Sequence, residues 1–147
     1  MVKILCTICA RAGSKGLKNK NIISFYNKPL ISHTIMQAKK SKLFREIVVS
    51  TDSKKIKDIA TKYGAKCWYL RSRKLSNDST SKIEVIIDTL KNAEKKFKVK
   101  YDFIMDLDIT SPLRNVVDIK KAYNKLIKNK KDFLIPGNKS KKNPYYN

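Results

Sequence analysis

The 147-residue chain has few of the residues that build metal centres and disulfide frameworks. It contains one histidine, His33, and three cysteines, Cys6, Cys9 and Cys67. Cys6 and Cys9 form a C-x-x-C pattern, but they lie in an apolar run typical of a strand, where residues three apart point to opposite faces. No second cysteine pair accompanies them. The pattern therefore argues against a zinc or redox site, and an odd cysteine count favours reduced thiols.

Long hydrophobic runs are also absent. No apolar segment approaches the ~20 residues that a membrane-spanning helix needs. The short apolar run after Lys3 lacks the small-residue cleavage site of a signal peptide. We therefore expect no membrane segment and a cytoplasmic location. The hydrophobic content of 41% and the length fit one globular domain with a substantial core.

Acidic residues are scarce, with 12 Asp and Glu against 34 Lys and Arg, which gives a formal net charge of +22. Such a charge first suggests a polyanionic partner such as nucleic acid. However, only five of the cations are arginines, and the lysines are scattered along the chain rather than gathered in one block. Nucleic-acid readers favour clustered arginines, so the pattern argues against specific nucleic-acid binding. A basic, non-catalytic fragment that binds nucleotides or nucleic acid stays as the alternative hypothesis.

Strand and helix patterns alternate along the sequence. Short apolar runs predict strands at 3–9, 46–50, 66–70, 101–108 and 132–136, and apolar residues at helical spacing predict helices at 29–38, 52–64, 83–97 and 119–127. We expect Pro29 to lie in the first turn of the first helix, Thr51 or Asp52 to cap the second, and Gly64 to end it. This alternation predicts an α/β fold, a parallel Rossmann-like sheet with helices on both faces.

Ligands bind at the carboxyl ends of the strands in such sheets. This rule selects the loops at 10–21, 50–52, 71–81 and 106–114. In the first loop, Gly13 and Gly16 make backbone N–H groups accessible, and Arg11, Lys15 and Lys20 supply cations. Together these groups suit a polyphosphate, although the loop matches neither a Walker A motif nor the dinucleotide fingerprint. The alternative is a loop of solvated lysines.

The third loop places Arg71 near a strand end and Ser79, Thr80 and Ser81 at the start of a helix. A helix N-terminus rich in hydroxyl groups suits a base edge, a ribose or a phosphate. Simple capping of the helix would also explain these hydroxyl groups.

The fourth loop follows Asp106 and Asp108 at the end of a predicted strand. Alternate residues of a strand share a face, so both carboxylates could point toward one cation. Alternatively, one aspartate caps and the other is solvated. The segment "TSPLR" then adds a rigid turn at Pro112 and a further cation, Arg114.

Five segments, in this order and spacing, resemble the acylneuraminate cytidylyltransferases: "ARAGSKGLKNKN", "IVVSTD", "YGA", "LRSRKLSNDSTS" and "TSPLR". These enzymes are the CMP-sialic acid synthetases, including those for legionaminic and related nonulosonic acids. The resemblance runs from Ile4 to about Pro136 and covers most of the chain. The 3-deoxy-manno-octulosonate cytidylyltransferases share the fold, but "STD" together with "TSPLR" favours the sialic-acid branch.

The resemblance implies a nucleotidyl transfer on a nucleotidyltransferase sheet. The anomeric hydroxyl of a nine-carbon α-keto acid sugar attacks the α-phosphate of CTP, with Mg²⁺ present, and pyrophosphate leaves. The family's triphosphate loop corresponds here to Arg11, Lys15 and Lys20, which we expect to be catalytic. The substrate-binding positions implied are Ala10, Gly13, Ser14 and Asn21 in the first loop, and Arg71, Asp78, Thr80 and Ser81 around cytosine and ribose.

Two departures from the family pattern carry further expectations. Many members read "LLQPTSPLR" where this chain reads "MDLDITSPLR", so Asp108 replaces a glutamine near the acceptor sugar. An aspartate there resembles members that act on legionaminic-type sugars, and Asp108 could instead hold Mg²⁺ together with Asp106.

The family also continues beyond "NPYYN", with metal-binding aspartates and a dimerisation segment. We therefore expect residues 1–136 to form a CTP-binding domain and residues 137–147 to form a basic polar tail. The chain would then be the N-terminal part of an enzyme, and the resemblance implies that the full-length members of this family are homodimers.

Overall fold

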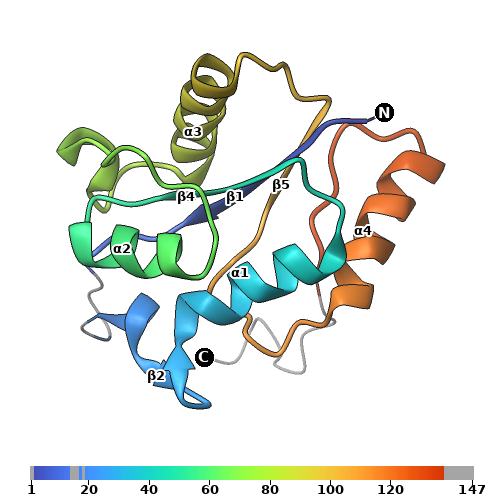
Figure 1. Cartoon of the computed structure of the whole chain (residues 1–147). Coiled ribbons are helices and arrows are strands. Elements are labelled where there is room, and N and C mark those ends of the chain that lie inside the picture. Colours follow the sequence, from blue (N-terminus) through green and yellow to red (C-terminus); the bar gives the residue numbers. More distant parts are fainter. Residues whose placement is uncertain (1, 14–16, 18, 138–147) are drawn as a thin grey trace, which may run out of the picture.

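A computed structural model describes residues 2–13, 17 and 19–137 of the chain (Figure 1). Its centre is a parallel sheet of three strands, β1 (Ile4–Cys9), β4 (Glu46–Ser50) and β5 (Phe103–Asp106), in the order β4-β1-β5. The central strand β1 is buried along its length except at Cys9. Its continuous apolar run is what a parallel strand covered on both faces requires. The predicted α/β fold is confirmed.

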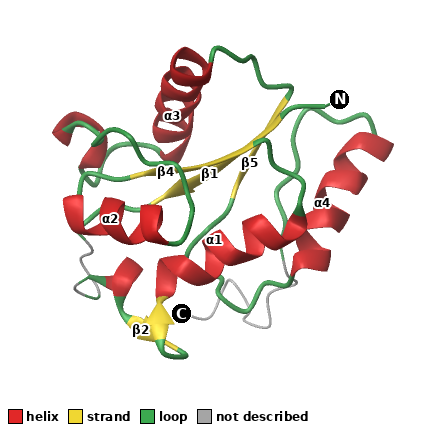
Figure 2. Cartoon of the chain, viewed as in Figure 1, coloured by secondary structure: helices red, strands yellow, loops and turns green. Residues whose placement is uncertain are grey.

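Helices cover both faces of this sheet (Figure 2). Helix α3 (Lys82–Phe97) lies on one face, and α1 (Leu30–Ser41) and α2 (Lys54–Lys62) lie on the other, where α4 (Val116–Lys128) packs against α1. Because neighbouring strand residues point to opposite faces, the core is divided in two. Leu5 and Val48 pack with Ala93 of α3. Cys6 and Ile8 pack with α1 and α2 in the larger cluster.

Helix α2 begins and ends with recognisable capping residues. The hydroxyl of Ser53 accepts a hydrogen bond from the N–H of Ile56 at 3.3 Å, so Ser53 is the N-cap. The prediction of Thr51 or Asp52 as the cap is wrong, because Thr51 Oγ1 accepts from the N–H of Ser53 and Asp52 Oδ1 accepts from the N–H of Ala12 in the first loop. Gly64 has a φ of 91° just after the helix, and the prediction that it ends α2 is confirmed.

A small hairpin precedes α1. It pairs β2 (Ser24–Phe25) with β3 (Lys28–Pro29), and its turn residues Tyr26 and Asn27 both have positive φ, as a type I′ turn demands. Pro29 is the N-cap of α1, so the helix begins one residue later than the sequence predicts. Two 3₁₀ helices, η1 (Lys20–Ile22) and η2 (Arg73–Ser76), lie in the loops at the carboxyl edge of the sheet.

Two predicted strands are wrong. Residues 66–70 run beside β4 but form only one bridge, between Lys66 and Val48. The segment leaves the sheet because Trp68 packs its ring against Phe97 of α3, with centroids 5.1 Å apart. Residues 132–136 form no strand, and Ile135 is 83% exposed. An apolar run needs a paired neighbour to become a strand, and no described segment pairs with this one.

Of the predicted tail at 137–147, all but Gly137 lies outside the described residues, and the division of the chain after residue 136 stays a prediction. None of the helices in the described part of the chain has the length and apolarity to cross a bilayer.

Candidate active site

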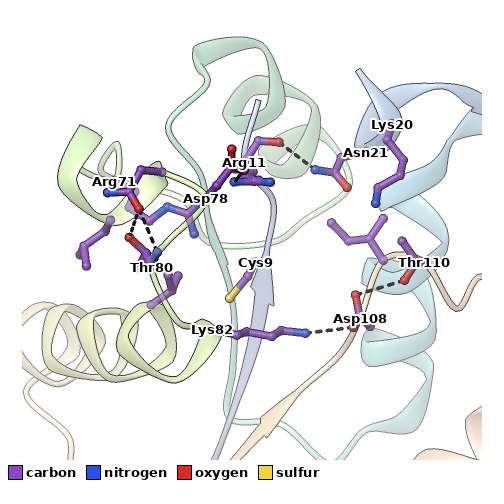
Figure 3. A pocket seen from close by; sticks show the side chains of 14 residues that line it. Cys9, Arg11, Lys20, Asn21, Arg71, Asp78, Thr80, Lys82, Asp108 and Thr110 are labelled. Atoms are coloured by element: carbon purple, nitrogen blue, oxygen red, sulfur yellow. Dashed lines mark hydrogen bonds and ion pairs between the residues drawn. The ribbon is translucent and has the colours of Figure 1, made fainter. Parts of the chain in front are cut away.

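A cavity of about 360 Å³ opens at the carboxyl edge of the sheet, where the predicted loops meet (Figure 3). Seven of the predicted site residues line it: Arg11, Lys20, Asn21, Arg71, Asp78, Thr80 and Asp108. Seven others were not selected from the sequence: Cys9, Leu75, Asn77, Lys82, Val85, Ile109 and Thr110. Residues from the first, third and fourth of the loops selected by the rule for parallel sheets therefore meet around one cavity.

The first loop is fixed to its neighbours at both of its described ends. The N–H of Ala12 donates to Asp52 Oδ1 at 2.8 Å, and Asn21 Nδ2 donates to the carbonyl of Arg11 at 2.9 Å. Arg11 NH1 lies 2.5 Å from Asp78 Oδ1 in the third loop. Asp52 belongs to the predicted loop at 50–52, and its contact with Ala12 shows that this loop positions the first.

The remaining first-loop predictions have different outcomes. Ala10 is fully buried and its N–H donates to the carbonyl of Ser50 at 2.9 Å, so it lies at the base of the loop without lining the cavity. A Cβ added to Gly13 would meet no atom within 4 Å, which leaves open space beside its backbone. Ser14 and Lys15 lie outside the described residues.

The third loop is organised by Asn77. Its Oδ1 accepts hydrogen bonds from the N–H groups of Ser79 and Thr80, at 3.0 and 2.8 Å. Asparagine side chains commonly form such turns with the backbone that follows them, so the sequence "SNDST" indicates a turn at Asn77. Arg71 is only 6% exposed, and its Nε donates to the hydroxyl of Ser76 at 3.2 Å. The geometry thus presents Arg71 and Thr80 to the cavity from a pre-folded loop.

Ser81 is the N-cap of α3, because its hydroxyl accepts from the N–H of Glu84 at 3.2 Å. Capping, the simpler of the two readings of the hydroxyl-rich segment, therefore accounts for Ser81, which does not line the cavity.

Asp106 and Asp108 point toward one cation, as the sequence predicts, and that cation is the ammonium of Lys82. Lys82 Nζ lies 2.7 Å from Asp106 Oδ2 and 3.0 Å from Asp108 Oδ2. Burial lowers the pKa of Lys82, but its hydrogen bonds and ion pairs with the two carboxylates outweigh this and raise it. Burial raises the pKa of Asp108, and the opposing hydrogen bond and charge of Lys82 bring it below its usual value. Both partners are therefore charged at neutral pH.

The turn after β5 is tied to α1. Gln37 Nε2 donates to the carbonyls of Pro112 and Arg114, at 2.7 and 2.5 Å. Arg114 NH2 in turn donates to the carbonyl of Asp108 at 2.8 Å. Arg114 therefore holds the backbone that carries Asp108, and the rigid "TSPLR" turn serves to position the edge of the cavity.

The cysteines carry neutral thiols in the folded chain. Cys9 lines the cavity and its Sγ lies 3.5 Å from Asp106 Oδ1. Burial, with the nearby charge of Asp106, raises the pKa of Cys9 to about 12. Burial likewise raises the pKa of Cys6 far above its usual value, and neither cysteine forms a disulfide.

The donor set nevertheless suits Mg²⁺. Among the described residues no three His, Cys, Asp or Glu side chains gather as a closed metal cage. Mg²⁺ rarely uses such a cage, since one or two carboxylates, waters and substrate phosphates commonly complete its octahedral shell. Asp106 and Asp108 supply two convergent carboxylate oxygens, and Asp108 lines the cavity together with the cations Arg11 and Lys20, whereas Asp106 does not line it.

Comparison with known proteins identifies the family of this chain. Residues 5–145 match the cytidylyltransferase family. CMP-N,N'-diacetyllegionaminic acid synthase of Campylobacter jejuni is 47% identical over 147 residues, which are all of this chain and 63% of that protein. Pseudaminic acid cytidylyltransferase of the same species is 41% identical over 134 residues, 91% of this chain and 57% of that protein. The chain thus spans about three fifths of the length of these curated relatives.

Among solved structures, CMP:2-keto-3-deoxy-manno-octonic acid synthetase complexed with CTP has the same fold. Its TM-score is 0.69 at 23% identity, over 87% of this chain and 48% of that one. The sequence match over nearly the whole chain, together with the shared fold, shows that this chain belongs to the cytidylyltransferase family.

Proposed function

We propose that the cavity binds CTP and that this chain provides the nucleotide-binding part of a CMP-nonulosonic acid synthetase. The observation that supports this most directly is the meeting of Arg11, Lys20 and Arg71 around one cavity at the carboxyl edge of the sheet. Three cations from two loops suit a ligand that carries several negative charges in a row. The family membership selects the cytidine nucleotide among such ligands.

In the proposed reaction, the residues of this chain act mainly by positioning and charge neutralisation, as is usual for phosphoryl transfer. Arg11 and Lys20 bind the β- and γ-phosphates, which become the pyrophosphate leaving group. Arg71, with Thr80, holds the nucleoside end against the third loop. Asp78 contacts the ribose or keeps Arg11 in place through their ion pair.

Mg²⁺, held by Asp106 and Asp108, would neutralise the phosphate charge that develops as the bond to pyrophosphate breaks. Asp108 lines the cavity together with Arg11 and Lys20, so a metal-bound phosphate and the phosphates bound by these cations would have different partners.

We propose a legionaminic-type sugar as the acceptor. The residue Asp108, which replaces the usual glutamine, and the 47% identity with a CMP-N,N'-diacetyllegionaminic acid synthase both support this choice. We also propose a cytoplasmic location for this reaction.

Calorimetric titration with CTP, ATP and GTP, with and without Mg²⁺, tests the nucleotide. CTP should bind more tightly than either purine nucleotide, because one missing hydrogen bond in a buried site costs about 1–3 kcal/mol. Equal affinities for the three nucleotides would remove cytosine recognition from the proposal. Pyrophosphate release from CTP with legionaminic, pseudaminic and sialic acids then tests the acceptor, and a preference for sialic acid would overturn that part.

A further inference from the structure

Lys82 is a cavity residue whose role neither the sequence motifs nor the relatives' names assign. It is the first residue of α3, directly after the cap Ser81. From there its side chain extends past Cys9 to the carboxyl end of β5 (Figure 3). It places one ammonium group within 3.0 Å of both Asp106 Oδ2 and Asp108 Oδ2.

The two carboxylates are oriented by groups other than Lys82. The hydroxyl of Thr7 donates to Asp106 Oδ1 at 2.8 Å, and the hydroxyl of Thr110 donates to Asp108 Oδ1 at 3.3 Å. Each threonine thus binds the Oδ1 atom of one aspartate. The two Oδ2 atoms both face the ammonium of Lys82, and the threonines would keep them in this orientation if Lys82 moved away.

Lys82 itself is free to move. Its side chain is 46% exposed, and lysine carries a compact charge on a flexible four-carbon stem. A half-exposed ion pair of this kind contributes little, about 1 kcal/mol or less. Asp106 is only 15% exposed and is held by its strand, whereas Asp108 is 57% exposed and is oriented by its hydrogen bond from Thr110. A cation that competes for the two oxygens would displace the lysine rather than the carboxylates.

We propose that Lys82 is a built-in competitor of the divalent metal ion: its ammonium occupies the Asp106–Asp108 site in the free protein and leaves when the metal binds. The released ammonium stays at the cavity wall, beside Arg71 and Thr80. Metal binding therefore adds the charge of the ion to the cavity, and it leaves a second positive charge, that of Lys82, no longer paired with the two carboxylates. The benefit of this second charge to a polyphosphate rests on the proposed function, whereas the exchange itself does not.

Titration with Mn²⁺ alone, followed by the electron paramagnetic resonance signal of free Mn²⁺, tests the exchange without any nucleotide. Lys82→Met removes the competitor and should tighten Mn²⁺ binding about fivefold, the equivalent of about 1 kcal/mol. Lys82→Arg should do the opposite, because the planar guanidinium pairs with carboxylates more firmly than an ammonium does. Lys91→Met removes an exposed lysine from the same helix and should leave Mn²⁺ affinity unchanged.

Asp106→Asn should abolish the gain when combined with Lys82→Met, which ties the effect to this site. Mn²⁺ affinity that is unchanged in both Lys82 variants, or a gain that survives Asp106→Asn, would overturn the proposal. A merely structural ion pair would instead lower the free energy of unfolding of Lys82→Met without tightening Mn²⁺ binding.

CTP titration of the same proteins in EDTA separates this inference from the proposed function. If CTP binds while Lys82→Met gains no Mn²⁺ affinity, only the exchange is wrong. If Mn²⁺ binding tightens while CTP does not bind, the exchange stands and the proposed nucleotide is wrong.

Discussion

Arg11 NH1 and Asp78 Oδ1 lie 2.5 Å apart and join the loop after β1 to the loop before α3. The two side chains are 34% and 46% exposed, so the pair is open to water and to an incoming anion. A polyphosphate in the cavity would compete with Asp78 for the guanidinium. The pair therefore keeps the guanidinium oriented at the cavity until a ligand with greater negative charge arrives.

Arg11→Ala should weaken CTP binding more than CMP binding. The guanidinium is expected to meet the β- and γ-phosphates, and a hydrogen bond to a charged group contributes roughly 1.5–3 kcal/mol. We therefore expect an increase of about tenfold to a hundredfold in the Kd for CTP, measured by calorimetry, with a smaller change for CMP. Lys15→Ala should act in the same direction.

The matched control is Arg45→Ala, because Arg45 is exposed and lies just before β4, at the opposite end of the sheet from the cavity. It removes the same charge from the chain. Equal losses of CTP and CMP affinity in Arg11→Ala would contradict the assignment, and so would an equal loss in the two arginine variants.

Asn77→Ala should weaken CTP binding by loosening the third loop. Asn77 Oδ1 accepts from the backbone of Ser79 and Thr80, and without it the loop must be ordered when the ligand binds. We expect a loss of about 1 kcal/mol, or about fivefold in Kd. Asn77→Asp keeps the accepting oxygen and should retain most of the affinity; a loss as large as that of alanine would show that the acceptor is not what matters.

Gln37→Met should destabilise the chain by leaving two carbonyls without their donor. The amide of Gln37 holds the carbonyls of Pro112 and Arg114 against α1, and unpaired buried acceptors cost about 1–3 kcal/mol. Urea unfolding should show this loss, while Lys40→Met, an exposed change on the same helix, should not. Equal midpoints for the two variants would mean that water replaces the glutamine amide.

The free energy of unfolding should fall between about pH 9 and pH 11, in part because of Cys67. Burial raises the pKa of this thiol from 9.0 to about 11, although the charge of Lys57 partly opposes the shift. Above pH 9 the unfolded chain releases the thiol proton while the folded chain still retains it, so rising pH favours unfolding. Below pH 9 the thiol is neutral in both states and contributes no pH dependence.

Urea unfolding of the wild-type chain and of Cys67→Ala over this pH range measures the effect. The wild-type chain should lose more stability from pH 9 to pH 11 than the variant does. Parallel curves would show that Cys67 ionises equally in the two states.

The sequence predicted the fold well where burial and local pattern agree. The run from Ile4 to Cys9 is apolar because β1 is covered on both faces, and the helical spacing of α1 and α3 follows their packing against it. The segment at 66–70 is also apolar, but its apolar side chains do not belong to a sheet. Trp68 packs against Phe97 of α3, and no local sequence pattern distinguishes a side chain that packs on a helix from one buried in a sheet.

The sequence indicated which loops would form the candidate site, but it did not indicate which side chains would contact one another there. Glycine, cations and hydroxyl groups at strand ends indicated where a nucleotide would bind. Lys82 was missed because it is one lysine among many, and only the register that sets Thr7 opposite Asp106 brings the end of β5 within its reach. Asp52 was read as a cap because its partner, Ala12, is 40 residues away along the chain.

The order of the strands also determines when this cavity can come into existence. Thr7 and Asp106 are 99 positions apart, yet their hydrogen bond lies at the floor of the site. A chain emerging from the ribosome therefore presents its phosphate-binding loop long before it possesses the opposite wall. Contacts between such distant segments form late and slow the folding of a domain. The cavity is therefore complete only when the last strand has joined the sheet, and a chain that ends before β5 would lack both Asp106 and Asp108.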